Sequence, residues 1–288
     1  MKRERTNYIQ KAFDITKENM ILAQPLVIYM LVLSFTLAGL GTQSNPALRL
    51  VFLTTNILLA TAFFAGWFSM IRQGIFLNKK IENGEFKNAE DRMKASWDLG
   101  KTFFPGVGDN FLNITSTSIL FIISFLVITY LFYKLGTNFL PNPNLDLNKM
   151  YAAANSTTAE LQKYLLSLSI DQIKAINLWG LYISGIVSAF TFATMFLFPA
   201  IFTNNKEEKE FFLLVPFTAF ARNVVFLFKN ILGSIGIFVF LFSLNTIFSI
   251  LSLIFNLNIF LSIVGLILSF YVMTYAMVLI FLYYEEKN

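Results

Sequence analysis

The sequence predicts an all-α integral membrane protein with six transmembrane helices, and three observations support this class. Of its 288 residues, 56% are hydrophobic and only 14% are charged, whereas soluble domains carry about 25% charged residues. The apolar residues form unbroken blocks longer than about 18 residues, the length that a helix needs to cross a bilayer. No Asp, Glu, Lys or Arg lies near the centre of any of these blocks.

Each apolar block is long enough to cross roughly 30 Å of hydrocarbon at about 1.5 Å per residue. The first block exceeds the apolar region of a signal peptide, which has about 7–15 residues, so we expect it to be retained as a span. The six expected spans are residues 20–40, 51–71, 111–133, 178–202, 231–255 and 259–284.

The distribution of basic residues predicts that both termini lie in the cytoplasm. With the N-terminus inside, 17 of the 22 Lys and Arg residues fall in cytoplasmic segments and five fall outside, as the positive-inside rule requires. The same rule accounts for the net charge of +5, so no nucleic acid is expected as a partner. The Phe-, Ile-, Asn- and Lys-rich composition is typical of an AT-rich bacterium, which predicts the bacterial cytoplasmic (inner) membrane.

The residue types that most often carry catalysis are missing or badly placed. The chain has no Cys and no His, which excludes thiol nucleophiles, thiolate metal sites and histidine proton shuttles. The acidic residues lie outside the spans, in charged turns. FFPGVGDN (103–110) could offer glycine N–H groups to a phosphate, but it completes no P-loop. We interpret it as a break between a surface helix and the third span. No catalytic, metal-binding or cofactor-binding residue is therefore predicted.

A threefold internal repeat is predicted within a single domain that covers residues 1–288. KAFDITKENMIL, KASWDLGKTFFPGVGDNFLN and TAFARNVVFLFKNILG each contain Ala, a nearby aromatic residue, one or more basic residues and Asn, followed by a span. Each repeat is expected to be an amphipathic interfacial helix followed by a helical hairpin. The expected repeats are residues 11–74, 94–203 and 218–284.

The segment AFARNVVFLFKNIL (219–232) decides whether such interfacial helices exist. Upright in the bilayer, Arg222 and Lys229 would differ in depth by about 10 Å. Lying flat, both reach anionic headgroups while the Phe side enters the acyl chains. We therefore expect a surface helix, with the span beginning near Ile231. The basic residues expected at the membrane interface are Arg222, Lys229, Lys11, Lys17, Lys94 and Lys101.

The segment 134–177 is the longest loop expected on the outer side, and it carries helical signals of its own. Thr157 and Glu160 fit a capping box, and Ser169 and Gln172 repeat the pattern before a short stretch at 170–176. A helical loop resting on lipid headgroups is favoured over a lid above an outward-facing cavity.

Several polar residues lie at or near membrane depth. Asn245, Ser249 and Ser252 share one face of the fifth span, Asn56 lies in the second span and Asp109 precedes the third. They could line a cavity for a polar substrate, or they could bond to neighbouring helices with about 0.6–2 kcal/mol per contact. Because no charge accompanies them in the spans, packing is favoured.

Residues 196–240 combine a Pro at the end of a span, a charged turn, an amphipathic segment with a basic residue, and a Gly-containing span. Pro199, Arg222, Lys229, Gly233 and Gly236 occupy these places. In this respect the segment resembles bacterial membrane proteins related to the membrane domain beside some glycerophosphodiester phosphodiesterases. The chain carries no phosphodiesterase domain, so the resemblance implies a membrane role without that activity.

The sequence therefore predicts a non-enzymatic membrane protein, either an assembly partner or an organiser of envelope lipid. The expected partners are membrane lipid and either a second copy of the chain or another membrane protein. The alternative is a transporter or permease component for an amphiphile or a small neutral solute. An enzyme acting on lipid is the least supported function, since no reactive constellation is found.

Overall fold

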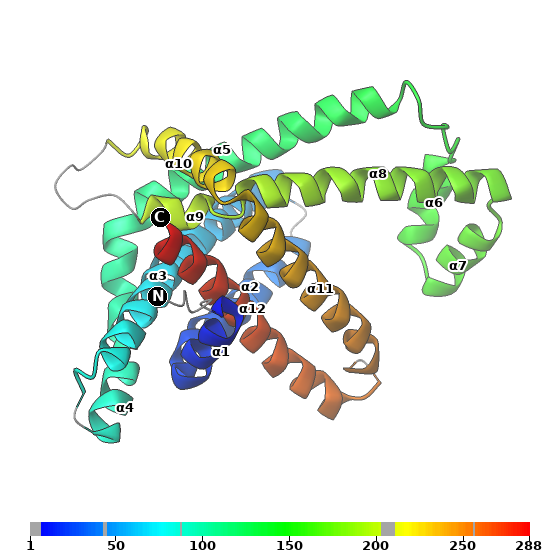
Figure 1. The fold of residues 1–288 in the computed structure, drawn as a ribbon. Helices are drawn as coiled ribbons and strands as arrows, with labels where there is room; N and C mark the ends of the chain where they lie inside the picture. The colour runs from blue at the N-terminus through cyan, green and yellow to red at the C-terminus, as the bar shows by residue number, and fades with distance from the viewer. Residues whose placement is uncertain (1–6, 43–44, 87, 203–210, 256) are drawn as a thin grey trace. The chain divides into compact units, whose positions relative to one another are not determined.

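The computed structural model describes residues 7–42, 45–86, 88–202, 211–255 and 257–288, and within these residues it contains helices and turns but no β-strand (Figure 1). Six helical segments in this part of the chain are long and apolar enough to cross a membrane. The prediction of an all-α, six-span membrane protein is therefore confirmed. In chain order, with η denoting a 3-10 helix, the elements are α1 (Tyr8–Glu18), η1 (Met20–Ala23), α2 (Gln24–Thr42), α3 (Pro46–Glu82), α4 (Ala89–Asp98), η2 (Leu99–Thr102), α5 (Phe103–Gly136), α6 (Leu147–Ala154), α7 (Thr158–Leu166), α8 (Ile170–Thr194), α9 (Leu197–Ile201), α10 (Val215–Lys229), α11 (Ile231–Phe255) and α12 (Ile259–Lys287).

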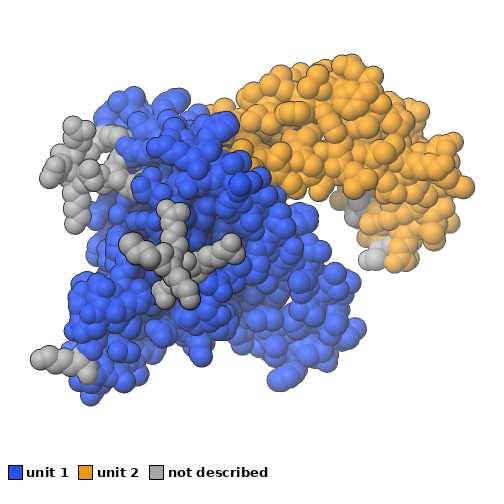
Figure 2. Space-filling view, viewed as in Figure 1, with its two compact units in different colours: residues 1–120, 194–288 blue, residues 121–193 orange. Residues whose placement is uncertain are grey.

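The chain divides into two compact units (Figure 2). Unit 1 contains residues 1–120 and 194–288, and unit 2 contains residues 121–193. The division falls inside α5 and at the end of α8, so these two helices contribute to both units.

The buried core of unit 1 lies at one end of its two helical hairpins, α2–α3 and α11–α12. Trp67 and Phe68 in the C-terminal half of α3, and Phe281 and Tyr284 near the end of α12, are all almost completely buried. The rings of Phe68 and Phe281 lie 5.3 Å apart, and the ring of Tyr284 lies 4.5 Å from that of Phe226 in α10. Aromatic packing therefore joins α3, α10 and α12 at this end.

The first helix packs along the end of the last one (Figure 1). Ala12 and Ile15 of α1 are fully buried, and the rings of Tyr8 and Tyr283 meet edge to face at 5.2 Å. The residues that follow α1 are anchored to α3, since Trp67 Nε1 donates a hydrogen bond of 2.7 Å to the backbone oxygen of Leu22. Both ends of the described chain therefore lie at the same end of unit 1, as an even number of spans requires.

Within each hairpin of unit 1, a few specific contacts fix the two helices or the turn between them. Thr36 Oγ1 in α2 donates a 2.5 Å hydrogen bond to Asn56 Oδ1 in α3. At the α11–α12 turn, Asn258 Oδ1 accepts from the backbone N–H of Leu261 and caps α12. Gly265 lets the ring of Phe255 approach the α12 backbone closely. Most other side chains in the halves of the hairpins away from the core are exposed, as expected for surfaces that face lipid.

Unit 2 is also built on an antiparallel helix pair joined by aromatic residues. Phe190 of α8 packs against Phe121 and Phe125 of α5, with ring centroids 5.1 and 5.2 Å apart. At the other end of the pair, a Cβ at Gly136 would lie only 2.8 Å from the ring of Tyr182. The hydroxyl of Tyr182 donates to the backbone oxygen of Phe132 at 2.9 Å. Gly136 therefore lets the rings of Tyr182 and Trp179 in α8 approach the α5 backbone closely.

Both helix starts predicted in the segment 134–177 are present. Thr157 Oγ1 accepts from the backbone N–H of Glu160 at the start of α7. Ser169 and Gln172 form a reciprocal capping box at the start of α8, with bonds of 3.2 and 2.9 Å. The helix that begins at Ile170 does not end at residue 176 as expected but continues to Thr194. No proline interrupts the chain between these positions, so the cap also starts the fourth span.

The predicted break at residues 103–110 is wrong in position. The chain leaves regular α-helix at η2, and α5 begins at Phe103 and runs through Pro105, Gly106 and Gly108. Pro105 lies in the first turn of α5, where its missing N–H would in any case have no partner within the helix. A Cβ at Gly106 would meet the Ser69 side chain of α3, whereas one at Gly108 would meet nothing within 4 Å. Gly106 is therefore a position of close helix packing and not part of a loop.

Candidate functional site

The junction between α10 and α11 is the first part of the candidate site. Helix α10 ends at Lys229, and α11 begins at Ile231. Between them the backbone N–H and the side-chain Nδ2 of Asn230 both donate to the backbone oxygen of Phe226, at 3.0 and 3.2 Å. Residues 217–255 are therefore two helices separated at Asn230, and a single straight helix over this range is excluded.

The same arrangement occurs at the end of α1. The backbone N–H and the Nδ2 of Asn19 both donate to the backbone oxygen of Ile15, at 3.0 and 2.9 Å. Asn110, the corresponding Asn of the second predicted repeat, donates from Nδ2 to the backbone oxygen of Gly106 at 3.2 Å. Asn110, however, lies inside the continuous helix α5. Asn19 and Asn230 thus end their helices, while Asn110 makes the same side-chain bond without a break.

A cavity of about 650 Å³ lies beside the α10–α11 junction; we call it the junction cavity. It is bordered by the start of α1, by the α10–α11 junction and by the end of α12. Two lysines contribute to its wall together with two tyrosines, while its other residues are mostly apolar or glycine. The lining residues are Asn7, Tyr8, Ile9, Lys229, Asn230, Ile231, Leu232, Gly233, Gly236, Ile237, Tyr283 and Lys287.

The acidic residues at the end of α12, beside the junction cavity, form ion pairs with basic residues of other helices. Lys11 Nζ lies 2.8 Å from Glu286 Oε1 and 3.1 Å from Glu82 Oε2, and Arg72 Nε lies 3.0 Å from Glu285 Oε1. Burial alone would lower the pKa of Lys11, but its hydrogen bonds to Glu286 and Glu82 and the charges of these carboxylates raise it above the usual value. Among the described residues, no carboxylate forms such a pair with Lys229 or Lys287.

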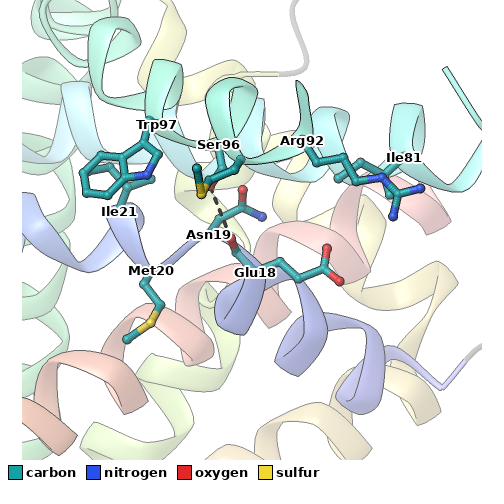
Figure 3. A pocket seen from close by; sticks show the side chains of 9 residues that line it. Glu18, Asn19, Met20, Ile21, Ile81, Arg92, Ser96 and Trp97 are labelled. Carbon is teal, nitrogen blue, oxygen red and sulfur yellow. Dashed lines mark hydrogen bonds between the residues drawn. The ribbon is translucent and has the colours of Figure 1, made fainter. Parts of the chain in front are cut away.

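A second cavity, of about 260 Å³, lies where α1 ends; we call it the N-terminal cavity (Figure 3). The end of α1, the end of α3 and the helix α4 border it. Ser96 of α4 donates a 3.2 Å hydrogen bond to the backbone oxygen of Glu18 across its wall. Its lining contains one acid, Glu18, and one base, Arg92. The two cavities thus occupy comparable places next to an Asn-terminated helix, but only the junction cavity has an excess of basic residues.

A third depression, of about 450 Å³, runs between α2, α3 and the start of α5; we call it the lateral groove. Several of its wall residues are exposed, with Ile28 at 56% and Phe104 at 80%. Only a glutamine and the hydroxyl of a tyrosine interrupt its apolar lining. The lining residues are Gln24, Pro25, Ile28, Tyr29, Val32, Leu59, Ala62, Phe63, Met70, Gly100, Phe103, Phe104 and Val107.

The basic residues predicted at the interface lie on or beside the short helices that precede the spans. Lys229 lines the junction cavity, and Lys11 is the centre of the ion pairs described above. Lys101 of η2 pairs with Asp98 at 2.6 Å. The remaining three are Lys17 at the exposed end of α1, Lys94 on the exposed surface of α4, and the half-buried Arg222 of α10.

The polar residues for which the sequence left open a role in lining a cavity, with packing favoured, lie outside the junction cavity, the N-terminal cavity and the lateral groove. Asn56 bonds to Thr36 and so links α2 to α3. Asn245 and Ser249 are exposed on α11, and Ser249 and the half-buried Ser252 donate to backbone oxygens of their own helix. Asp109 is exposed near the start of α5. Asn245, Ser249 and Ser252 are therefore neighbours on α11, whereas Asn56 lies on α3 and Asp109 on α5.

Asn223 is a structural residue that the sequence analysis missed. It is completely buried in α10, and its Oδ1 accepts a 3.1 Å hydrogen bond from the backbone N–H of Phe196 just before α9. The sequence spacing could have pointed to it. Asn223 lies four residues after Ala219 and three before Phe226, so it shares their face of the helix. Both of these residues are buried, and an amide on a buried face needs a hydrogen-bond partner.

The described residues contain no group of three acidic, histidine or cysteine residues that could hold a metal ion. Comparison of the chain with models of known protein families, with curated proteins and with solved structures finds no match. The resemblance of residues 196–240 to the phosphodiesterase-associated membrane domain therefore stays a prediction.

Proposed function

We propose that this chain is a non-enzymatic, multi-pass protein of the bacterial cytoplasmic membrane that organises membrane lipid or assembles with a membrane partner. Its N- and C-termini would both face the cytoplasm. The excess of Lys and Arg in the corresponding segments supports this orientation. The packing of α1 on the end of α12 agrees with termini on one side of the membrane.

In this orientation α1, α4 and α10 would lie in the inner interface. Each is a short helix that precedes a span and carries basic residues, such as Lys17, Lys94 and Lys229. The breaks at Asn19 and Asn230 separate α1 and α10 from the spans that follow. Because the helix axis can change direction at such a break, the short helix can lie along the membrane surface with its lysines facing anionic headgroups.

The lateral groove is the single observation that carries the proposal. Its walls are apolar and belong to spans or to the residues that enter them, and side chains such as Ile28 and Phe104 are exposed along it. At membrane depth, an apolar groove with exposed walls is filled by an acyl chain or by the side chains of another helix. We expect an acyl chain to occupy it in a bilayer.

The test uses nanodiscs that contain a zwitterionic phospholipid with a photoreactive diazirine near the end of one acyl chain. After illumination, mass spectrometry of peptides should locate the strongest labelling at Ile28, Phe104 and neighbouring groove residues. Ala62→Trp places a large side chain in the groove and should reduce this labelling several-fold. Ala38→Trp, at an exposed position of α2 outside the groove, is the control and should leave it unchanged.

Two outcomes would contradict the proposal. Labelling spread evenly over all exposed spans and unchanged by Ala62→Trp would show that the groove holds no lipid. Flux of a neutral solute or amphiphile into proteoliposomes, abolished by Ala62→Trp but not by Ala38→Trp, would favour the transporter instead.

A further inference from the structure

We infer that the junction cavity binds an anionic phospholipid, with Lys229 and Lys287 contacting the phosphate group and the open surface of α11 at Gly236 receiving the start of an acyl chain. This inference rests on the proposed function, because it names the headgroup class that a lipid-binding protein of this kind would select. It concerns a different place from the lateral groove, since the junction cavity and the groove share no lining residue.

The charged residues in the described lining of the junction cavity are both lysines. Lys229 ends α10 and Lys287 ends α12, so two elements far apart in the sequence each bring one amine to the cavity wall. The two acids at the end of α12 are paired elsewhere, Glu286 with Lys11 and Glu285 with Arg72. The described lining contains no Asp or Glu. A cavity with two lysines and no acid in its lining is complementary to a phosphate.

Two tyrosines, Tyr8 and Tyr283, form the part of the cavity wall next to Lys287. The ring of Tyr8 lies edge to face against that of Tyr283, at 5.2 Å, and the Lys287 ammonium lies 6.0 Å from the centre of the Tyr8 ring. The Tyr283 hydroxyl lies directly against Gly233. These contacts give Lys287 a defined surface to lie on at the end of its helix, and they fix the border between the polar and apolar sides of the cavity.

The apolar side distinguishes a lipid from a free phosphate. Ile231, Leu232 and Ile237 line the cavity along the first turns of α11, next to the two glycines. At Gly236 an added Cβ would meet no atom within 4 Å, so space for a ligand continues along the helix from the lysines into the span. Inorganic phosphate could use the two amines but would leave this apolar surface in contact with water.

The N-terminal cavity provides an internal comparison. It lies beside the same kind of Asn-terminated helix, yet its lining contains one acid, Glu18, as well as one base, Arg92. Its volume is about 260 Å³ against about 650 Å³ for the junction cavity. A place beside a helix break is therefore not sufficient to make a site for an anionic phospholipid. The junction cavity differs from the N-terminal cavity in its excess of lysine and in its larger volume.

The experiment measures phospholipid binding to the full chain in detergent micelles by native mass spectrometry. The probes are phosphatidylglycerol, which is anionic, and phosphatidylcholine, which is zwitterionic, and inorganic phosphate is added in a separate arm. Lys229→Gln/Lys287→Gln removes both cavity amines. The control, Lys163→Gln/Lys174→Gln, changes the net charge equally at exposed lysines of unit 2 that lie outside the three cavities and outside the proposed interfacial helices.

We expect the unmodified chain to bind phosphatidylglycerol more tightly than phosphatidylcholine. Each lysine near an anionic lipid contributes enough that losing two should reduce this preference by roughly tenfold or more. The control double variant should keep the preference. Gly236→Leu should reduce phosphatidylglycerol binding by filling the apolar side. Gly185→Leu, which also introduces a side chain where a Cβ meets nothing within 4 Å but in α8 of unit 2, should not.

The inference is overturned if the two lysine double variants lose the preference equally, or if the unmodified chain shows none. It is also overturned if inorganic phosphate competes with phosphatidylglycerol at equal concentration, since a soluble anion would then be the ligand. These failures differ from failure of the proposed function. If the proposed function fails, the residues of the lateral groove will not be labelled by lipid. If only the inference about the junction cavity fails, lipid will still bind, but without the predicted dependence on the headgroup and on Lys229 and Lys287.

Discussion

Lys11 Nζ lies 2.8 Å from Glu286 Oε1, and this ion pair joins the first helix of the chain to the last. Glu82, at the end of α3, lies 3.1 Å from the same amine. One lysine therefore ties together three helices that are far apart in the sequence. The lysine and Glu286 side chains are only 20% and 16% exposed, so solvent screens this pair less than an ordinary surface pair.

We predict that Lys11→Gln destabilises the protein by about 1–3 kcal/mol, because two carboxylates lose a charged hydrogen-bond donor in a partly buried place. The measurement is the thermal unfolding midpoint in detergent. Lys17→Gln, on the exposed side of the same helix, should leave the midpoint nearly unchanged. Equal shifts for the two variants would mean that the pairs of Lys11 contribute nothing specific.

The same lysine predicts a dependence of stability on alkaline pH. Burial lowers the pKa of Lys11, but its hydrogen bonds and the charges of Glu286 and Glu82 outweigh burial and raise the pKa in the folded protein. The contribution of Lys11 should therefore be complete below the unfolded pKa of about 10.4 and disappear as the pH rises through the folded pKa. The difference in midpoint between the unmodified chain and Lys11→Gln should stay constant near neutral pH and shrink only above that range. A difference that shrinks near neutral pH would contradict this assignment.

The membrane class and the number of spans could be predicted because they depend on long apolar blocks, which the bilayer requires whatever the tertiary packing. The helix starts at Thr157 and Ser169 could also be predicted, since a capping box depends on residues three positions apart. The start of α5 could not be predicted in this way. Pro105, Gly106 and Gly108 favour a break by local preference, but α5 runs through all three, and Gly106 lies against Ser69 of α3.

Gly106 and Gly108 therefore offer a matched pair of substitutions in the same helix. A Cβ at Gly106 would meet the Ser69 side chain, including Oγ at 2.6 Å, and would lie 3.4 Å from the backbone oxygen of Ala65. We predict that Gly106→Ala costs about 1–3 kcal/mol, because α5 and α3 have to separate. Gly108→Ala meets no neighbouring atom and should be neutral or slightly stabilising, since alanine favours a helix. The thermal midpoints of the two variants test this, and equal values would mean that α5 does not approach α3 at Gly106.

The candidate site was only partly predictable for a different reason. Lys229 and the break at Asn230 could be inferred from the order of charges and apolar residues within one segment. Lys287 could not be connected with them, because the junction cavity forms only when α12 and α1 pack beside the start of α11. The pattern Asn245, Ser249 and Ser252 has the spacing of one helix face, but spacing alone does not tell whether that face is covered.

Substitution of Asn223 and of Asn245 compares a polar residue on a covered helix face with one on an exposed helix face. Asn223 is completely buried, and its side-chain oxygen accepts from the Phe196 N–H at 3.1 Å. Asn223→Ala leaves that N–H buried without this acceptor, so we predict a loss of about 1–3 kcal/mol, seen as a lower thermal midpoint. Asn245 is exposed on the apolar helix α11, so Asn245→Ala should leave the midpoint unchanged in detergent. If both variants lowered the midpoint equally, Asn245 would have a hydrogen-bond partner outside its own chain. Cross-linking at Ser249, on the same face of α11, would then show whether that partner is a second copy.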